Sequence, residues 1–516
     1  MQKVETRTGN SINNAFFSVV KYVIALICSF TLRTLVIKYF GEEFLGINSL
    51  CSNILSILSI TELGIGTSLI YKLYKPVAED DKAKIKSLLL LYKKIYLTLG
   101  LIVLVLGICV TPFLGILTKQ QTFNFNKYVI FLIFLVNSVL SYILGHRRAL
   151  IFVYQKNYIE MIITSVATLI ALPFQIIAMC VLKDVYLYVL GTLLITLIDS
   201  VILYIVTKNR YKEIKQFEAK EITREDVVEI KKNTFAMAFT KISTVVFKGV
   251  DSILVSALFG VAMLGLYSNY YVIFTYLFAI SNMICGAIKA SVGNYVASHT
   301  KEESYKLFKM INFGFTWFVM FCTISLVVLF QPFMILWSGV VNSNLLLPIM
   351  VPIAFGLYFY IDANRDVVRI FKEANGLFWK DKYIPLISAI INLALSVVLG
   401  KLIGVSGVIM ASVISIVILP QWIETRILFK EYFNISSWHY WKRYIIYVSI
   451  CLLSGGLTYY LSTLIKLSGI SLLVVNILLC IVIPNVINFI CFFKTDELKS
   501  IINFARGFLN KKNKNT

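Results

Sequence analysis

Residues 40–46 read FGEEFLG and residues 259–265 read FGVAMLG, so a Phe-Gly pair and a Leu-Gly pair recur at the same spacing. The offset between the copies is 219 residues, that is 259 minus 40, and without a gap it also aligns Ser49 with Ser268. An apolar, helix-length stretch precedes and follows each copy. Apolar composition inflates chance matches, but a membrane hairpin repeated halfway along a chain is typical of a two-bundle transporter.

Composition identifies the broad class of protein. Of the 516 residues, 58% are hydrophobic and 15% are charged, and the mean hydropathy is +0.81. Soluble domains are about half apolar and about a quarter charged, so we expect an all-α integral membrane protein. A span needs about 20 mostly apolar residues, and fourteen stretches qualify: 13–38, 45–71, 86–112, 127–152, 158–182, 185–207, 233–258, 263–289, 307–336, 345–371, 383–401, 404–428, 441–464 and 470–493.

The net charge of +22 is distributed to one side of the predicted membrane. With the N-terminus placed inside, the positive-inside rule puts both termini in the cytoplasm. The basic balance then reflects topology and attraction to anionic membrane lipids, and no nucleic-acid partner is expected. The outer loops and outer span ends hold only a few of the 49 Lys and Arg residues, namely Lys38, Lys119, Lys127, Lys183, Lys401 and Lys466.

The longest polar stretch, 208–232, is expected to be a cytoplasmic linker between two halves. The first spans of the two halves are separated by an even number of crossings, so the repeats run the same way about an axis along the membrane normal. We predict two pseudo-symmetric six-helix bundles at 1–207 and 233–430, two extra transmembrane helices at 431–493, and a basic cytoplasmic tail at 494–516.

Signatures of catalysis and metal binding are not found in the sequence. It has no GxxxxGK[ST], GxSxG or HExxH pattern and no CxxC pair, so we expect no enzyme, no metal site and no cofactor. Coupling to a proton or sodium gradient or to the membrane potential is the energy source that fits. No cleavable signal peptide is visible, because residues 1–10 are polar and the first apolar run is too long.

Ionisable residues inside apolar spans are expected to face a cavity or a partner, because each costs about 2.5–3.5 kcal/mol at mid-bilayer. The span 233–258 carries Lys241, Lys248 and Asp251 at i, i+7 and i+10, which places them on one stripe of a helix. The favoured interpretation is a cationic cavity wall that binds substrate. The alternative is a self-neutralising Lys248–Asp251 pair and a Lys241 that snorkels to the inner face.

Two further candidates for substrate binding, Lys21 and Arg33, lie in the first span. Across the repeat, Lys21 aligns within one residue of Lys241, and Arg33 lies within two residues of the equivalent of Asp251. Both halves therefore carry charge at matching depths. Arg33 is close enough to the outer end of its span that snorkelling to the surface is an equal alternative.

Three cations, Arg147, Arg148 and Lys289, stand at the predicted cytoplasmic mouths of their spans. Arginine forks suit phosphate geometry, so the two arginines are candidates for capturing a phosphate group of the substrate. The simpler interpretation for all three is a positive-inside anchor.

Five other ionisable residues are candidates for coupling or gating. Glu62 precedes two closely spaced glycines that loosen its helix, and it either pairs with Lys21 or carries a coupling proton or sodium ion. The other four, Asp362, Arg365, Asp366 and Arg369, lie at i, i+3, i+4 and i+7 on one helix face. They form either an inner gate or a self-neutralising structural network.

The stretches 44–76 and 248–268 carry a resemblance to a known family. The first contains FLG, ELGIG and YKLYKP, and the second contains KGVD, FG and LGLYS. They resemble bacterial polysaccharide and oligosaccharide flippases (Wzx-like) of the multidrug/oligosaccharidyl-lipid/polysaccharide exporter superfamily. The similarity extends over most of the chain in span order, linker position and inner-loop length.

The resemblance implies two bundles around a central cavity, alternating access, and residence in the cytoplasmic membrane of a bacterium. The implied substrate is an oligosaccharide on undecaprenyl diphosphate, a repeat unit of capsule, exopolysaccharide or cell-wall polysaccharide. The implied partners are this lipid-linked oligosaccharide and membrane lipids, with a polysaccharide polymerase and glycosyltransferases as further candidates. Fourteen spans also resemble the lipid II flippase branch, in which the last two helices form a lipid-tail groove.

Three alternatives stay open at the level of sequence. The first is a flippase for lipid II or a teichoic-type precursor, which shares the mechanism and differs in the sugar. The second is a cation-coupled multidrug exporter, against which Lys21, Lys241 and Lys248 argue, because such exporters rely on acidic cavity residues for cationic drugs. The third is a scaffold in a polysaccharide assembly complex.

Overall fold

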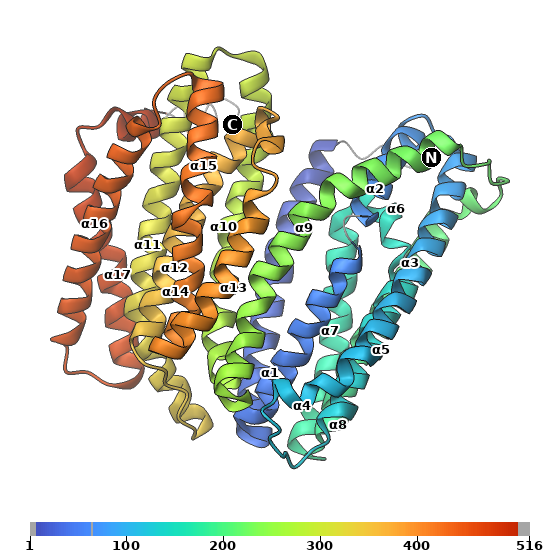
Figure 1. The fold of residues 1–516 in the computed structure, drawn as a ribbon, viewed down its shortest axis with the longest axis horizontal. Helices are drawn as coiled ribbons and strands as arrows, with labels where there is room; N and C mark the ends of the chain where they lie inside the picture. The colour runs from blue at the N-terminus through green and yellow to red at the C-terminus, as the bar shows by residue number, and fades with distance from the viewer. Residues whose placement is uncertain (1–6, 63–64, 504–516) are drawn as a thin grey trace, which may run out of the picture. The chain divides into compact units, whose positions relative to one another are not determined.

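The structure of the chain, a computed structural model, describes residues 7–62 and 65–503. This part of the chain is helical and contains no strand (Figure 1). The α-helices are α1 (Arg7–Leu58), α2 (Ile65–Ala78), α3 (Lys82–Val110), α4 (Leu114–Leu117), α5 (Lys127–Gly145), α6 (Arg148–Val153), α7 (Asn157–Cys180), α8 (Val185–Arg210), α9 (Arg224–Phe259), α10 (Val261–Ser298), α11 (Lys301–Val341), α12 (Met350–Ala374), α13 (Ile384–Ile403), α14 (Val405–Ile418), α15 (Pro420–Ile427), α16 (Trp438–Thr463) and α17 (Gly469–Phe492). The tighter 3₁₀ turns are η1 (Ser59–Glu62), η2 (Thr111–Phe113), η3 (Lys212–Lys215) and η4 (Leu377–Trp379), and η5 (Leu428–Phe433) is π-helical.

Within the described residues, 11 helices are long and apolar enough to cross a membrane. Helix α1 counts once among them, although it contains the first predicted span and the start of the second. Helix α12, which corresponds to the predicted span 345–371, carries ionisable residues and falls outside the count. Of α9, which corresponds to the predicted span 233–258, the described residues contribute only the shorter apolar stretch Gly249–Phe259. The predicted all-helical, multi-pass membrane architecture is confirmed.

The contacts divide the chain into two compact units, Met1–Gly265 and Leu266–Thr516. In the first unit, α1 packs on α7, α7 on α8, α8 on α5, α5 on α3, α3 on α2, α2 on α9, and α9 on α1. These helices therefore form a closed sequence of neighbours, which can enclose a cavity. The predicted domain boundaries at 207 and 233 stay a prediction.

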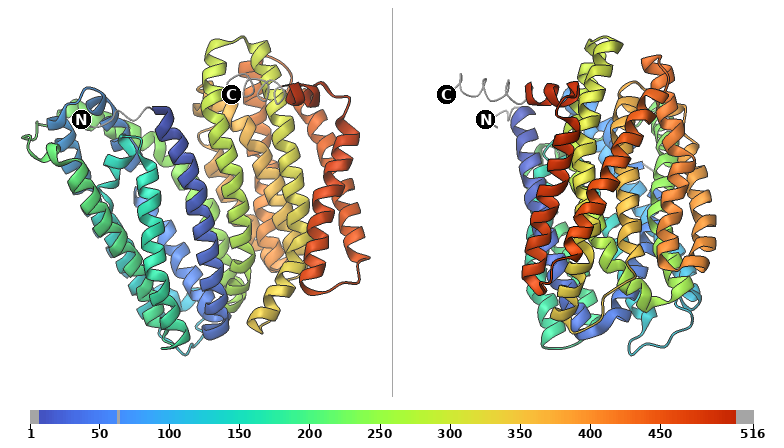
Figure 2. Two further views of the ribbon diagram at one scale, coloured as in Figure 1. Left: turned by 180° about the vertical axis from the view of Figure 1, so that it is seen from behind. Right: turned by 90° about the vertical axis from the view of Figure 1, so that its left-hand side faces the viewer.

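The second unit is built on the long helix α11, which packs against α12, α16 and α17. Helix α12 also contacts α14 and α15, and α14 pairs with α13. Aromatic rings fill the space between α10 and α12, where the ring centroids of Phe274 and Phe355 lie 4.9 Å apart. The two C-terminal helices, drawn in red, lie together beside α11 in both views of Figure 2.

The two glycines that follow the repeated phenylalanines have the same backbone conformation. Gly41 has φ 81° and ψ 177°, and Gly260 has φ 92° and ψ 172°. This is a region that residues with a Cβ rarely adopt, so glycine is required at both positions. The first kinks α1 and the second separates α9 from α10, which supports the repeat read from the sequence.

The two glycines of the Leu-Gly pairs mark a close crossing of helices inside the first unit. A Cβ placed on Gly46 would lie 2.0 Å from the carbonyl oxygen of Val261, and one on Gly265 would lie 2.2 Å from the carbonyl oxygen of Glu42. Val261 is the residue that the 219-residue offset aligns with Glu42. The two contacts are therefore pseudo-symmetric copies of each other, and the repeat predicted from spacing is also a repeat of packing.

Candidate functional site

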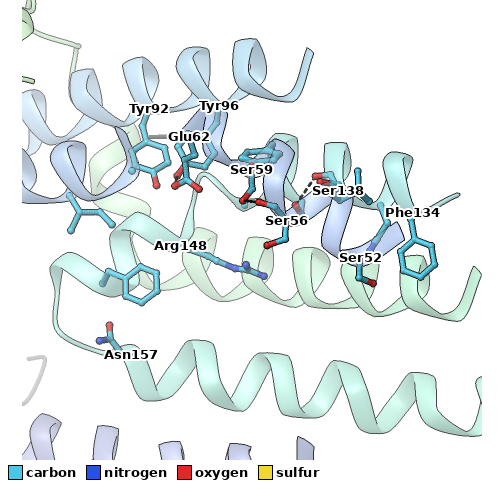
Figure 3. Close-up of a pocket in the computed structure, with 18 of the residues that line it drawn as sticks. Ser52, Ser56, Ser59, Glu62, Tyr92, Tyr96, Phe134, Ser138, Arg148 and Asn157 are labelled. Atoms are coloured by element: carbon cyan, nitrogen blue, oxygen red, sulfur yellow. Dashed lines mark hydrogen bonds between the residues drawn. The ribbon is translucent and has the colours of Figure 1, made fainter. Parts of the chain in front are cut away.

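A polar cavity of 850 Å³ lies inside the first unit, lined by α1, η1, α2, α3, α5, α6 and α7 (Figure 3). This volume is within the range of about 300–1,000 Å³ that is usual for small-molecule sites. The lining combines hydroxyl and amide groups, aromatic rings and two ionisable side chains. It includes Ser52, Ser56, Ser59, Asn137, Ser138, Ser141 and Asn157; Tyr74, Tyr92, Tyr96, Phe134, Tyr142 and Phe152; and Glu62 and Arg148.

The cavity lies where the second predicted span is not a continuous α-helix. Helix α1 ends at Leu58, η1 covers Ser59–Glu62, and α2 begins at Ile65. Backbone that leaves the α-helical pattern at membrane depth is tolerated only where protein buries it or where it lines a water-filled cavity. Interrupted helices also form the substrate and ion sites of many transporters, so the break and the cavity indicate the same site.

Glu62 is fixed to the cavity wall by helix α3. Tyr96 donates a hydrogen bond from its hydroxyl to Glu62 Oε1 at 2.6 Å, and the Tyr92 ring stacks on Tyr96 at a centroid distance of 4.4 Å. A Cβ on Gly66 would lie 2.3 Å from the Tyr96 hydroxyl and 2.7 Å from Glu62 Oε1. Only glycine at position 66 therefore leaves room for this contact.

Arg148 enters the cavity from α6 (Figure 3), and a chain of polar contacts behind the wall neutralises it. Its Nη2 donates to Asp199 of α8, a residue that is only 3% exposed. Thr164 of α7 donates to Asp199 Oδ1 at 3.1 Å and lies 3.2 Å from Glu160 Oε1. The last member of this series of polar contacts is Lys21 of α1, whose Nζ lies 3.5 Å from Glu160 Oε2.

The interpretation that Lys21 pairs with Glu62 is therefore wrong, because the structure pairs Lys21 with Glu160 and bonds Glu62 to Tyr96.

Arg147 does not join the described lining of the cavity; its guanidinium carbon lies 4.5 Å from the centroid of the Tyr204 ring. Arg33 is half-buried in α1 and is also outside that lining.

The predicted stripe on α9 is described only in part. The side chains of Lys241 and Lys248 lie outside the described residues, whereas Asp251 is buried, at 5% exposure. The helix that carries all three packs against α1 and α2. The cationic cavity wall stays a prediction.

In the second unit, the four charged residues of α12 form a network. Arg365 lies 2.9 Å from Asp362, and Arg369 lies 2.9 Å from both Asp362 and Asp366. The sequence did not reveal the fifth member, Glu424 of α15, which accepts two hydrogen bonds from Arg365 at 3.1 Å. The network therefore joins α12 to α15, and both Arg365 and Glu424 are buried.

Two more ion pairs extend from the same helix. Lys372, which is buried, bonds to Asp381 just beyond α12, and it lies 3.8 Å from Glu424. Lys289 of α10 pairs with Glu373 of α12, and both side chains are exposed. Lys289 is thus held to a carboxylate in this structure, and its assignment to substrate binding stays a prediction.

Apolar grooves flank the two C-terminal helices. One of 480 Å³ lies between α10, α11 and α17, with Tyr276, Phe333 and Ile477 among its lining residues. A second, of 290 Å³, lies between α11, α12 and α16, beside Gly455. Both have almost entirely apolar walls, so they suit hydrocarbon and not a polar group.

Several residues of the site were missed in the sequence. Glu160 and Asp199 lie inside predicted spans and would have been found by applying the rule for intramembrane charges to every span. Ser52, Ser56 and Ser59 have helical spacing that places them on one face. By contrast, Tyr96 carries no sequence pattern that distinguishes it from the other tyrosines of the chain.

A family model described as Polysaccharide biosynthesis protein matches residues 11–290 of the chain. No curated protein matches the chain in sequence. Among solved structures, the lipid II flippase MurJ in an inward closed conformation is similar with a TM-score of 0.63 at 14% identity, covering 93% of this chain and 99% of that chain.

Two other solved structures share the fold. An inward-facing multidrug resistance MATE family transporter of the MOP superfamily has a TM-score of 0.61 at 12% identity, covering 77% of this chain and 92% of that one. A MOP superfamily transporter from Pyrococcus furiosus, described as having a binding pocket of reverse polarity, has a TM-score of 0.53 at 11% identity, covering 80% of this chain and 94% of that chain. At these identities the likeness shows the fold.

Proposed function

Because the chain belongs to the polysaccharide biosynthesis protein family, we propose that it moves an oligosaccharide linked to undecaprenyl diphosphate across the cytoplasmic membrane of a bacterium. The observation that carries the proposal is the polar cavity at the interrupted helix of the first unit. Transfer of unpaired polar groups into hydrocarbon costs several kcal/mol each. A sugar chain therefore needs a polar compartment inside the protein to cross a hydrocarbon core about 30 Å thick.

The lipid tail has the opposite requirement and can stay in apolar surroundings throughout. The grooves beside α16 and α17 offer such surfaces at the edge of the second unit. We assign them to the polyprenyl chain, and we assign exchange of the head group between the two membrane faces to alternating access. In this proposal both termini are cytoplasmic, and a polysaccharide polymerase and glycosyltransferases are neighbours in the same pathway.

Coupling to a proton or sodium gradient, or to the membrane potential, would drive net transport. Glu62 fits this role in position, because it lines the cavity and Tyr96 holds one of its oxygens. The α12–α15 network fits a gate, because movement between these helices would separate Arg365 from Glu424. A charge left buried without its partner costs about 3–5 kcal/mol, so such a gate can open only if Arg365 and Glu424 both reach water or new partners.

The proposal is tested by deleting the gene and analysing membrane lipids by mass spectrometry. We expect a lipid-linked oligosaccharide to accumulate while surface polysaccharide falls, and its mass identifies the sugars. Accumulation of lipid II or of a teichoic precursor would assign the chain to that related substrate. A change only in sensitivity to cationic drugs, with normal surface polysaccharide, would contradict the proposal.

A further inference from the structure

Three buried polar atoms in the cavity of the first unit have no hydrogen-bond partner within the described part of the chain. They are Asn137 Oδ1 on α5, Arg148 Nε on α6 and Asn157 Oδ1 on α7. Buried polar atoms in native proteins are nearly always paired, because an unsatisfied one costs about 1–3 kcal/mol. Three such atoms from three helices around one cavity indicate an occupant that forms hydrogen bonds.

The charges of the described lining identify which kind of occupant fits. Arg148 is neutralised by Asp199, so it offers the free Nε–H but no net positive charge. Glu62 carries a carboxylate whose described hydrogen-bond donor is the neutral Tyr96. A diphosphate placed here would meet a carboxylate without an unpaired cation among the described lining residues, and burying uncompensated charge is costly. The cavity therefore suits an uncharged group.

The remaining lining residues combine hydroxyl groups with aromatic faces. The hydroxyls are those of Ser52, Ser56, Ser59, Ser138 and Ser141, and the rings include the stacked pair Tyr92 and Tyr96. A sugar presents hydroxyl groups around its edge and C–H groups on its faces, so it matches both kinds of surface. Water also satisfies buried polar groups, but it makes no use of the aromatic faces.

We propose that this cavity binds the sugar end of the lipid-linked substrate and leaves the diphosphate outside, an inference that rests on the proposed function. Sugar hydroxyls donate to Asn137 Oδ1, to Asn157 Oδ1 and to the carboxylate of Glu62. Arg148 Nε donates to a sugar oxygen, and a sugar face packs against Tyr92 or Tyr96. The first unit thus selects the substrate by its sugar.

The test measures equilibrium binding to the purified full-length protein with two separate probes. The first is the oligosaccharide released by mild acid from the lipid that accumulates in deletion cells, and the second is undecaprenyl diphosphate without sugar. We expect the oligosaccharide to bind the wild type, and to bind Asn137→Leu and Ser56→Ala about tenfold more weakly, as expected for a lost hydrogen bond. Binding of undecaprenyl diphosphate should be unchanged in both variants.

Asn294→Leu is the matched control, because Asn294 is an exposed asparagine of α10 outside the cavity. If Asn137→Leu fails to fold, Ser56→Ala still tests the inference, because Ser56 is exposed and loss of its hydroxyl should leave the fold intact. The inference is overturned if the wild type does not bind the oligosaccharide, if both variants bind it normally, or if undecaprenyl diphosphate binding falls instead. If the wild type binds tetraphenylphosphonium in this cavity and deletion cells accumulate no lipid-linked oligosaccharide, the proposed function itself fails.

Discussion

At the scale of single residues, Gly66 determines the shape of the cavity wall. The space left by its missing side chain is where the Tyr96 hydroxyl meets Glu62 Oε1. A methyl group at this position would overlap both atoms. The hydrogen bond that orients the only carboxylate of the described lining therefore depends on a residue that makes no polar contact itself.

Gly66→Ala is predicted to displace Glu62 and to slow transport of the lipid-linked substrate by at least about tenfold. The atoms that the methyl group would meet are the ends of the Tyr96 and Glu62 side chains, which can shift, so transport should fall more than thermal stability in detergent. The control is Gly286→Ala on α10, where an added Cβ meets no atom within 4 Å, and which should be neutral or stabilising by up to about 1 kcal/mol. Equal transport by the two variants would refute this account of the wall.

The sequence predicted Glu62, Arg148 and Lys21 as functional candidates, because ionisable residues in apolar spans are rare and costly. It did not predict what each one contacts. Lys21 and Glu160 are separated by 139 residues in sequence, and Arg148 and Asp199 by 51. Such contacts depend on how α1, α7 and α8 pack, which periodicity within one helix does not determine.

At the scale of elements, the repeated Phe-Gly and Leu-Gly pairs correspond to a repeated crossing. Gly41 and Gly260 share a positive φ, and Gly46 and Gly265 each allow the backbone of the other copy to approach. Spacing alone predicted the repeat. The reciprocal contact required the structure, because a sequence match does not show which two backbones meet.

Gly46→Ala and Gly265→Ala are predicted to destabilise the protein by similar amounts, about 1–3 kcal/mol each, because each added methyl meets an equivalent carbonyl oxygen. The double variant should cost less than the sum, since the two sites share one crossing. Thermal unfolding in detergent measures all three, with Gly293→Ala as control, where an added Cβ has open space. If one of the two variants kept the stability of the wild type while the other lost much of it, the two contacts would not be equivalent.

A second element-level contact ties α9 to α2 and α3. Asp226, in the first turn of α9, lies 3.0 Å from Lys72 and 2.8 Å from Lys84. Burial opposes ionisation of this carboxyl, but hydrogen bonds from Lys84 and Lys72 outweigh it and lower the pKa of Asp226. A carboxyl with a lowered pKa stabilises the fold at a pH above its unfolded pKa, about 3.9, and loses this effect as pH falls through its folded pKa.

Asp226→Asn should therefore lower the melting temperature at pH 7, and its difference from wild type should shrink as the pH falls below about 4. The neighbouring Glu225→Gln is the control, because Glu225 is exposed. Melting curves measured from pH 3 to pH 8 check the prediction. A difference between Asp226→Asn and wild type that grows toward low pH would reverse the sign and refute it.

The predicted spans were located by hydropathy, because a membrane-crossing helix needs an uninterrupted apolar stretch. Hydropathy did not locate the 3₁₀ turn Ser59–Glu62 at the end of α1, because the average over a span-length window is dominated by the apolar residues on either side. The glycines at 64 and 66 indicated a loosened helix. Where the helix breaks, and that a cavity lies beside the break, follow only from packing.

At the scale of the whole molecule, the chain separates polar and apolar surfaces as a lipid-linked substrate requires. The first unit contains the hydroxyl-rich cavity, and the second carries apolar grooves beside its C-terminal helices. Among the described residues of this cavity and its wall, Arg148 is paired with Asp199 and Lys21 with Glu160, whereas the cationic wall expected on α9 stays a prediction. We therefore assign the recognition of sugar, and not of diphosphate, to this cavity.

Transfer of the accumulated lipid-linked oligosaccharide across the bilayer can be measured in liposomes that contain the purified protein. Membrane-impermeant periodate oxidises the sugars that reach the outer face. We predict rapid transfer with wild type and with Glu225→Gln, and transfer slowed at least about tenfold with Glu62→Gln, which keeps the size of the side chain but removes the carboxylate of the cavity. Equal transfer by Glu62→Gln and wild type would show that the cavity carboxylate has no part in transport, and no transfer by wild type would show that the protein does not flip this lipid.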